Sequence, residues 1–136
     1  MDIANELLRA KEELNTQREG DYSVALNGTN IFEVSTDKFV TIDNGVSRLW
    51  SLTTAYDSMF LDLETPETEG SVKQADGSLV VCTQAEWDTL FILMRAKGRE
   101  LFIKNEILIA MIDALTEDNT MDEVWNTTYE NVVIPS

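Results

Sequence analysis

The longest regular pattern of apolar positions runs from Thr83 to about Leu115, where no proline interrupts a series of good helix formers. Its apolar residues recur at steps of three, four or seven, which places them on one face of an α-helix. This stripe consists of Trp87, Phe91, Met94, Leu101, Leu108, Ile112 and Leu115. The pattern predicts one long helix that forms the core of the fold.

The start of this helix carries two capping signals. Thr83 and Glu86 form a capping box, in which each side chain accepts a hydrogen bond from the other residue's backbone amide. Cys82 and Trp87 flank the box at the positions of a hydrophobic staple. Both signals predict that the helix begins directly after Thr83.

Two residues interrupt the apolar stripe. Gly98 costs about 1 kcal/mol relative to alanine inside a helix, so it could permit a close helix crossing or mark a kink. Asn105 could fix the register of a partner helix, as buried polar residues do in coiled coils. The simpler interpretations, which we favour, are that the helix bends and that Asn105 lies at the edge of the stripe.

The N-terminal segment predicts a second helix over residues 2–18, with Asp2 as its cap and Gly20 as its end. Its narrow apolar stripe consists of Ile3, Leu7, Leu8 and Leu14. An ordinary amphipathic helix would bury such a stripe within the chain. A leucine-rich stripe of this width is also typical of a helix that pairs with another chain.

A hairpin is expected next. Residues 22–26 alternate between apolar and polar side chains, and Asn27-Gly28 is a strong hairpin-turn signal. We therefore expect strands at 22–26 and 30–34.

The following segment predicts a helix over residues 37–56, because Phe39, Ile42, Val46, Leu49 and Trp50 recur at helical spacing. Asn44-Gly45 interrupts that pattern. Residues 57–70 then contain five acidic residues and no basic one, which is typical of a surface loop. A short strand formed by Met59, Phe60, Leu61 and Leu63 is expected before this acidic loop.

The C-terminal half predicts a second hairpin, with strands at 71–75 and 78–82 around Asp76-Gly77. Thr120 and Glu123 form another capping box, which predicts a short helix over residues 121–126. We expect this helix to pack on the domain through Met121, Val124 and Trp125.

Taken together, these elements predict an α+β fold of small β-hairpins packed against a long helix in the C-terminal half and against shorter helices. We expect a single domain over residues 1–136, with an acidic loop at about 57–70 and a possible docking tail at 127–136. The tail contains the apolar group Val132, Val133 and Ile134, which could add a strand to a partner's sheet or pack on its own domain.

Composition supports a folded protein, since 43% of the residues are hydrophobic. No apolar run is long enough to span a membrane, and the N-terminus has no secretory-signal pattern. Cys82 is the single cysteine, which excludes an intramolecular disulfide and fits a reducing compartment or a virion assembled there.

The net charge of −15 is expected to repel nucleic acid and anionic membranes. The charge could serve solubility, dock on a basic partner, or mimic a DNA phosphate track. Mimicry would require acidic residues to dominate the long helical faces, whereas the long helix carries Arg95, Lys97, Arg99 and Lys104. Solubility is the interpretation we favour.

Candidate catalytic chemistry is scarce. The chain has no histidine, which is the commonest general base and metal ligand, and Cys82 therefore has no histidine to activate it. Phosphate-binding glycine loops, zinc spacings and calcium-loop patterns are absent from the sequence. We therefore expect no enzyme, no cofactor and no catalytic or metal-binding residue.

The order of several short motifs nevertheless resembles a known family over residues 5–126. The motifs are Leu8-Arg9-Ala10-Lys11, Asn27-Gly28, Ser35-Thr36-Asp37, Ala75-Asp76-Gly77-Ser78-Leu79-Val80-Val81-Cys82-Thr83 and Ala110-Met111-Ile112-Asp113-Ala114-Leu115-Thr116. In this order they are similar to an uncharacterised domain family encoded near the tail-fibre and tail-fibre-assembly genes of tailed bacteriophages. The acidic loop and the segment after Trp125 depart from that pattern.

This resemblance implies a non-enzymatic structural or adaptor component of the virion tail or tail fibre. A tail-fibre assembly chaperone is one alternative, and an acidic DNA-mimic inhibitor of a host defence enzyme is a second. The expected partners are other phage tail or tail-fibre proteins, with a possible homo-oligomer, in the virion tail or in the host cytoplasm during assembly. From the residues themselves, the candidate partner-binding side chains are Leu7, Leu8, Leu14, Val132, Val133 and Ile134.

Overall fold

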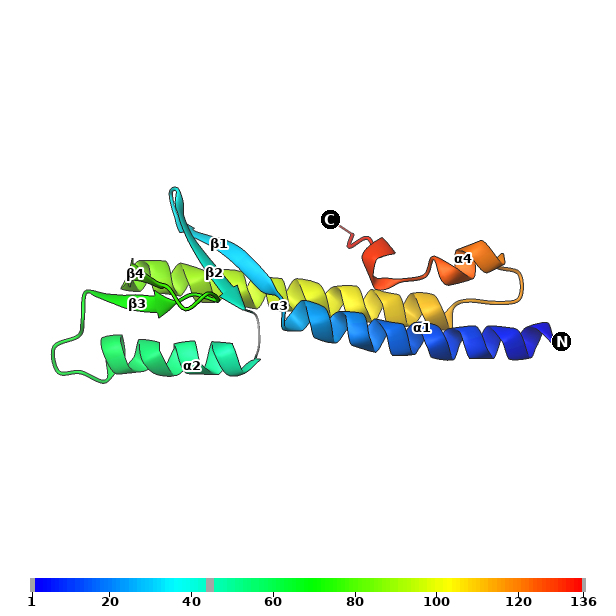
Figure 1. Ribbon diagram of the computed structural model, residues 1–136, viewed down its shortest axis with the longest axis horizontal. Coiled ribbons are helices and arrows are strands. Elements are labelled where there is room, and N and C mark those ends of the chain that lie inside the picture. Colours follow the sequence, from blue (N-terminus) through cyan, green and yellow to red (C-terminus); the bar gives the residue numbers. More distant parts are fainter. Residues whose placement is uncertain (1, 44–45, 136) are drawn as a thin grey trace. The chain divides into compact units, whose positions relative to one another are not determined.

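The computed structural model describes residues 2–43 and 46–135 and has the expected α+β class (Figure 1). Two antiparallel hairpins and a 30-residue helix in the C-terminal half define it. Its elements are α1 (Ile3–Leu26), β1 (Thr29–Ser35), β2 (Lys38–Asp43), α2 (Val46–Tyr56), the π-helical turn η1 (Asp57–Leu61), β3 (Glu69–Lys73), β4 (Leu79–Thr83), α3 (Gln84–Asp113), α4 (Met121–Trp125) and the 3₁₀ turn η2 (Tyr129–Asn131).

The backbone forms two compact units. The central unit is Leu26–Gly98, and the terminal unit combines Met1–Ala25 with Arg99–Ser136. Helix α3 contributes its first half to the central unit and its second half to the terminal unit. The expectation of a single domain over residues 1–136 stays a prediction.

The first expected hairpin is wrong, because α1 continues to Leu26 and includes residues 22–26. Tyr22 and Leu26 are four residues apart, so they share one face of a helix as readily as one face of a strand. Tyr22 packs beside Tyr129, with ring centroids 6.4 Å apart, and Val24 is exposed. Asn27-Gly28 therefore follows the end of a helix, where glycine is common, instead of forming a hairpin turn.

The actual partner of β1 is β2, so the expected helix over residues 37–56 is wrong in its first part and correct from Val46. Val40 and Ile42 alternate inward along β2, opposite Phe32 and Asn30 respectively. Asp37 forms the connecting turn with a positive φ of 59°, a conformation that aspartate adopts more readily than most residues. Asn44-Gly45 lies outside the described residues.

The strand expected at Met59, Phe60, Leu61 and Leu63 is also wrong. Residues Asp57–Leu61 continue α2 as a π-helical turn, which buries Phe60. The irregular part of the acidic loop is therefore residues 62–68, since Glu69 already belongs to β3.

The second expected hairpin is confirmed, with β3 and β4 joined through residues 74–78. Gly77 has a φ of +88°, which glycine adopts without strain. The Asp76 carboxylate accepts hydrogen bonds from the Ser78 amide at 2.9 Å and from its hydroxyl at 2.6 Å. Turn chemistry of this kind is local, which is why the sequence predicts it correctly.

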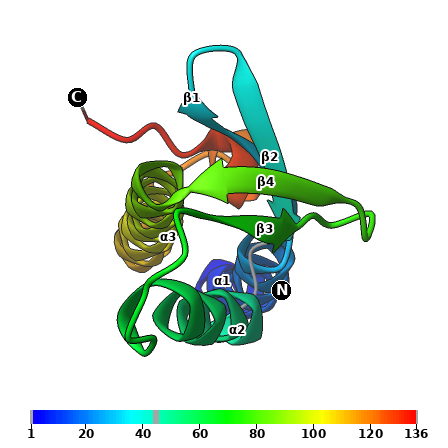
Figure 2. The ribbon, with the colours of Figure 1, turned by 90° about the vertical axis from the view of Figure 1, so that its left-hand side faces the viewer.

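Both hairpins bury one face in the core of the central unit. The β3–β4 hairpin lies between α2 and the β1–β2 hairpin (Figure 2). The core cluster consists of Phe32, Val34, Val40, Ile42, Leu52, Phe60, Val72, Cys82, Trp87, Leu90, Phe91 and Met94. Trp87, fully buried, also donates its indole N–H to the Gly70 carbonyl at 3.0 Å.

In the terminal unit, α1 runs antiparallel to the second half of α3. The Lys11 ammonium donates to the Asp113 carbonyl, whereas Arg18, seven residues further along α1, donates to Asn105, eight residues earlier in α3. The core consists of Ala10, Leu14, Leu101, Asn105, Leu108, Ile112, Leu115, Val124, Thr127, Tyr129 and Val132. The part of the predicted apolar stripe that lies in the second half of α3, namely Leu101, Leu108 and Ile112, is therefore buried in this core.

Asn105 is buried, so the favoured interpretation that it lies at the edge of the stripe is wrong. Its side-chain oxygen accepts a hydrogen bond from the Arg18 guanidinium at 2.9 Å. This contact agrees with the alternative, in which Asn105 fixes the register of a neighbouring helix. That helix is α1 of the same chain.

Gly98 lies within α3 without ending it. A Cβ atom added there would meet no other atom within 4 Å, so a close helix crossing does not explain this glycine.

Candidate partner-binding site

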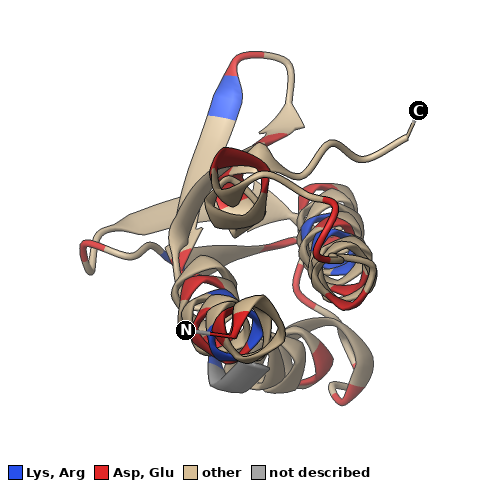
Figure 3. Cartoon of the chain, turned by 90° about the vertical axis from the view of Figure 1, so that its right-hand side faces the viewer, with Lys and Arg blue, Asp and Glu red and all other residues tan. Residues whose placement is uncertain are grey.

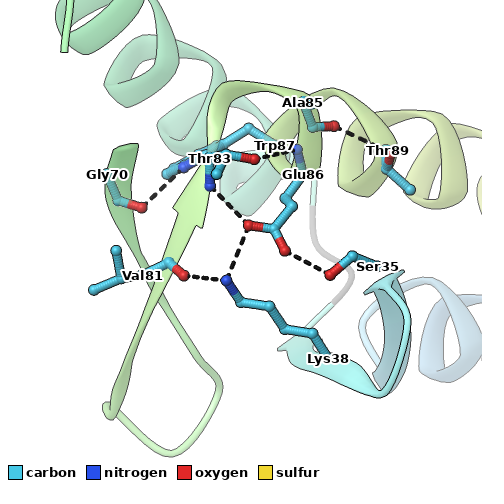
Figure 4. A network of polar contacts seen from close by, with 9 residues as sticks. All are labelled: Ser35, Lys38, Gly70, Val81, Thr83, Ala85, Glu86, Trp87 and Thr89. Carbon is cyan, nitrogen blue, oxygen red and sulfur yellow. Dashed lines mark hydrogen bonds and ion pairs between the residues drawn. The ribbon is translucent and has the colours of Figure 1, made fainter. Parts of the chain in front are cut away.

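A polar network joins the start of α3 to both hairpins of the central unit (Figure 4). The predicted capping box is present, because Thr83 Oγ1 accepts from the Glu86 amide and Glu86 Oε1 accepts from the Thr83 amide at 2.9 Å. Glu86 also accepts from the Ser35 hydroxyl at 2.6 Å and from the Lys38 ammonium at 2.9 Å. Lys38 donates to the Val81 carbonyl as well.

This network connects the start of α3 to β1, β2 and β4. Its charged groups are unsuited to proton transfer near neutral pH. The hydrogen bond from Ser35, together with those from Thr83 and Lys38, lowers the pKa of Glu86 to about 2. The bond to Glu86 raises the pKa of Lys38 above its ordinary value. Each charge thus stabilises the other in its ionised form.

A second polar cluster lies beside α2. The Tyr56 hydroxyl donates to Asp88 at 2.7 Å and accepts from the Gln84 amide at 3.0 Å. The bond to Asp88 raises the pKa of Tyr56, which keeps the phenol protonated. Within residues 2–43 and 46–135, no group of three or more His, Cys, Asp or Glu side chains could hold a metal ion.

A candidate binding surface is the α1–α4 groove of the terminal unit, which has a volume of about 320 Å³. It is lined by Glu6, Arg9, Ala10, Glu13, Met121 and Trp125. Helix α4 begins as predicted, since Thr120 Oγ1 accepts from the Glu123 amide at 3.2 Å.

The expected packing of α4 is correct only for Val124. That side chain is fully buried, whereas Met121 is 45% exposed and Trp125 is 46% exposed. A helix of five residues spans little more than one turn, so it cannot bury apolar side chains on all sides. The two side chains that remain outside both line the groove.

Acidic residues predominate around this groove. Glu6 and Glu13 line it, and the single basic lining residue, Arg9, lies 3.5 Å from the Glu13 carboxylate. The terminal unit contains 14 acidic and 5 basic residues, a net charge of −9. Acidic positions occur on helices, turns and loops alike (Figure 3).

The six side chains predicted to bind partners do not form one surface. Leu14 and Val132 are buried in the terminal unit, while Leu7 and Ile134 are half-buried. Leu8 and Val133 are exposed. The sequence interpretation missed Met121 and Trp125 as surface residues, and the shortness of α4 is the signal that could have revealed them.

The hairpins also expose apolar side chains in the central unit. Ile31 and Phe39 are diagonal neighbours on the outer face of β1–β2, and Leu79 and Val81 share the outer face of β4. None of these four residues lines a groove described in this structure. The α1–α4 groove is therefore the stronger candidate.

Comparisons with protein-family models, with curated proteins and with solved structures find no match to this chain. Among the described residues, no helix is both long and apolar enough to span a membrane.

Proposed function

We propose that this protein is a non-enzymatic, phage tail-associated adaptor that binds another tail or tail-fibre protein through the α1–α4 groove. The observation that carries the proposal is the pair of half-exposed side chains, Met121 and Trp125, in a concave site. Tryptophan is enriched among the residues that dominate binding energy, and methionine adapts its shape to varied partners.

The polar networks support binding over catalysis. In the Glu86 network, the carboxylate and the Lys38 ammonium are both held in their charged forms. A general base needs a pKa near the working pH, and neither group has one. The phage tail context comes from the resemblance of the ordered motifs.

The spread of acidic residues favours an adaptor over the DNA-mimic alternative. A mimic needs a continuous acidic track, whereas Arg9 interrupts the acidic residues that line the groove. The assembly chaperone shares the binding chemistry of an adaptor and differs only in leaving before the particle is complete.

The test has two parts. Mass spectrometry of purified particles should detect the chain, and a pull-down from infected cells should recover a tail protein. Trp125→Ala should lose that tail protein, whereas Trp50→Ala, a change at a 71% exposed tryptophan of the central unit, should retain it. Recovery with the chain absent from particles would favour the chaperone. If the Trp125→Ala variant recovers as much tail protein as the wild type, the groove is not the binding site.

A further inference from the structure

The apolar part of the α1–α4 groove is small. Its volume of about 320 Å³ is at the low end for small-molecule sites, and only Ala10, Met121 and Trp125 supply apolar side chains. A groove of this size accepts one or two bulky side chains of a short segment.

Charge decides which segments fit. Glu6 and Glu13 lie at the groove, and Arg9 is already beside the Glu13 carboxylate. Asp122 directly follows Met121 in α4 and is exposed. An acidic segment would meet like charges here, and so would a second copy of this chain, whose net charge is −15.

We propose that the α1–α4 groove takes a short cationic segment of another protein, with an apolar side chain packed against Met121 and Trp125 and flanking Lys or Arg residues near Glu6 and Glu13. This inference rests on the proposed function, because it specifies the partner chemistry of the same site. The apolar contact supplies most of the affinity, and the charges select the segment.

Fluorescence titration tests the inference directly. Trp50→Phe removes the other exposed tryptophan, and Trp87 stays because it is buried. The probe is an acetylated hexapeptide with two central leucines flanked by two lysines on each side. Two control peptides replace the lysines with glutamates or the leucines with serines. The lysine–leucine peptide should shift the Trp125 emission to the blue, and both controls should bind at least about tenfold more weakly.

Matched variants separate the groove from the general acidity of the chain. Trp125→Ala, followed by calorimetry, should weaken peptide binding about tenfold or more. The pair Glu6→Gln and Glu13→Gln should weaken it about two- to fivefold per residue. The control pair Glu12→Gln and Glu106→Gln removes the same charge from exposed positions outside the groove and should leave affinity unchanged. Circular dichroism melts confirm that each variant is folded.

The outcomes distinguish this inference from the proposed function. Equal affinity for the lysine–leucine and lysine–serine peptides, or equal effects of the two glutamate pairs, would overturn the cationic-segment inference. If the peptide fails to bind but Trp125→Ala still loses the tail protein in the pull-down, the adaptor function stands and only the partner chemistry is wrong. Failure of both experiments would overturn both proposals.

Discussion

The two compact units use tryptophan in opposite ways. In the central unit, Trp87 is fully buried and packs among Tyr56, Phe60 and Phe91, with ring centroids 6.0–6.3 Å from its own. In the terminal unit, Trp125 is 46% exposed beside a groove. A large aromatic residue therefore stabilises a fold most where several elements enclose it. Where a short helix carries it, much of its apolar surface remains available to a partner.

The two units also hold their helices differently. The central unit fastens α3 to its hairpins through a charged pair, Lys38 and Glu86. The terminal unit joins α1 to α3 through Arg18 and the neutral side chain of Asn105. Both contacts are polar and lie beside an apolar core, but only the Lys38–Glu86 pair contains groups that titrate, so we expect them to respond differently to acid.

Replacing each of the two tryptophans with alanine should change stability by very different amounts. Trp87→Ala should lower the free energy of unfolding by about 3–5 kcal/mol, because it leaves a cavity in the core. Trp125→Ala should cost less than about 1 kcal/mol, because that side chain is half-exposed. Urea denaturation followed by circular dichroism measures both, and similar losses for the two variants would contradict the contrast.

A smaller effect is expected from the buried amide of the terminal unit. Asn105→Ala removes the acceptor of Arg18 Nη1 and should cost about 1–3 kcal/mol, since this nitrogen belongs to a largely buried side chain whose bond to Asn15 is made by a different nitrogen, Nε. Asn15→Ala is the matched control, because Asn15 accepts from the same Arg18 side chain but is less buried. A larger loss for Asn15→Ala in the same urea experiment would count against Asn105 as the register-fixing contact.

Lowering the pH should weaken the Lys38–Glu86 pair and leave the Arg18–Asn105 hydrogen bond unaffected. The pKa of Glu86 is about 2 in the folded chain and ordinary in the unfolded chain, so its contribution to stability is present above about pH 4.5 and is lost as the pH falls towards 2. Glu86→Gln should therefore flatten the fall in stability over that window. Asn105→Ala should not flatten it, because the amide does not titrate. Thermal melts from pH 7 to pH 2 measure the slopes, and parallel curves for wild type and Glu86→Gln would refute the assignment.

The smallest expected effect is a gain in stability. Gly98→Ala should raise the free energy of unfolding by about 0.5–1 kcal/mol, because alanine favours the helix and its methyl group meets no atom within 4 Å. Gly77→Ala should lower stability instead, because Gly77 has a positive φ in the β3–β4 turn. A loss on Gly98→Ala would show that this glycine has a packing role.

Local signals account for what the sequence could predict. The capping box at Thr83, the N-cap bond of Thr120 and the Asp76-Gly77 turn each depend on residues within four positions of one another, and all three are present. The sequence of residues 38–43 fits two structures, because Phe39 and Ile42 have the spacing of a helix and Val40 and Ile42 have the spacing of a strand. Only the pairing of β2 with β1 decides between these patterns.

The candidate site was harder to predict than the fold. Leu14 and Val132 looked available from their positions in the sequence, but the antiparallel pairing of α1 with α3 and the fold-back of the C-terminal segment bury them. Trp125 looked like a core residue because apolar side chains usually are. Which side chains stay exposed depends on how many elements surround them, and no local pattern encodes that.

The single cysteine, Cys82, can report on local opening of the central unit. Cys82 is fully buried in the central unit, and burial raises the pKa of its thiol, so the native chain should resist thiol reagents. Alkylation then proceeds only when β4 opens, at a rate that reports the opening equilibrium. The terminal unit contains no cysteine. The alkylation rate of the wild-type chain therefore reports opening of the central unit alone.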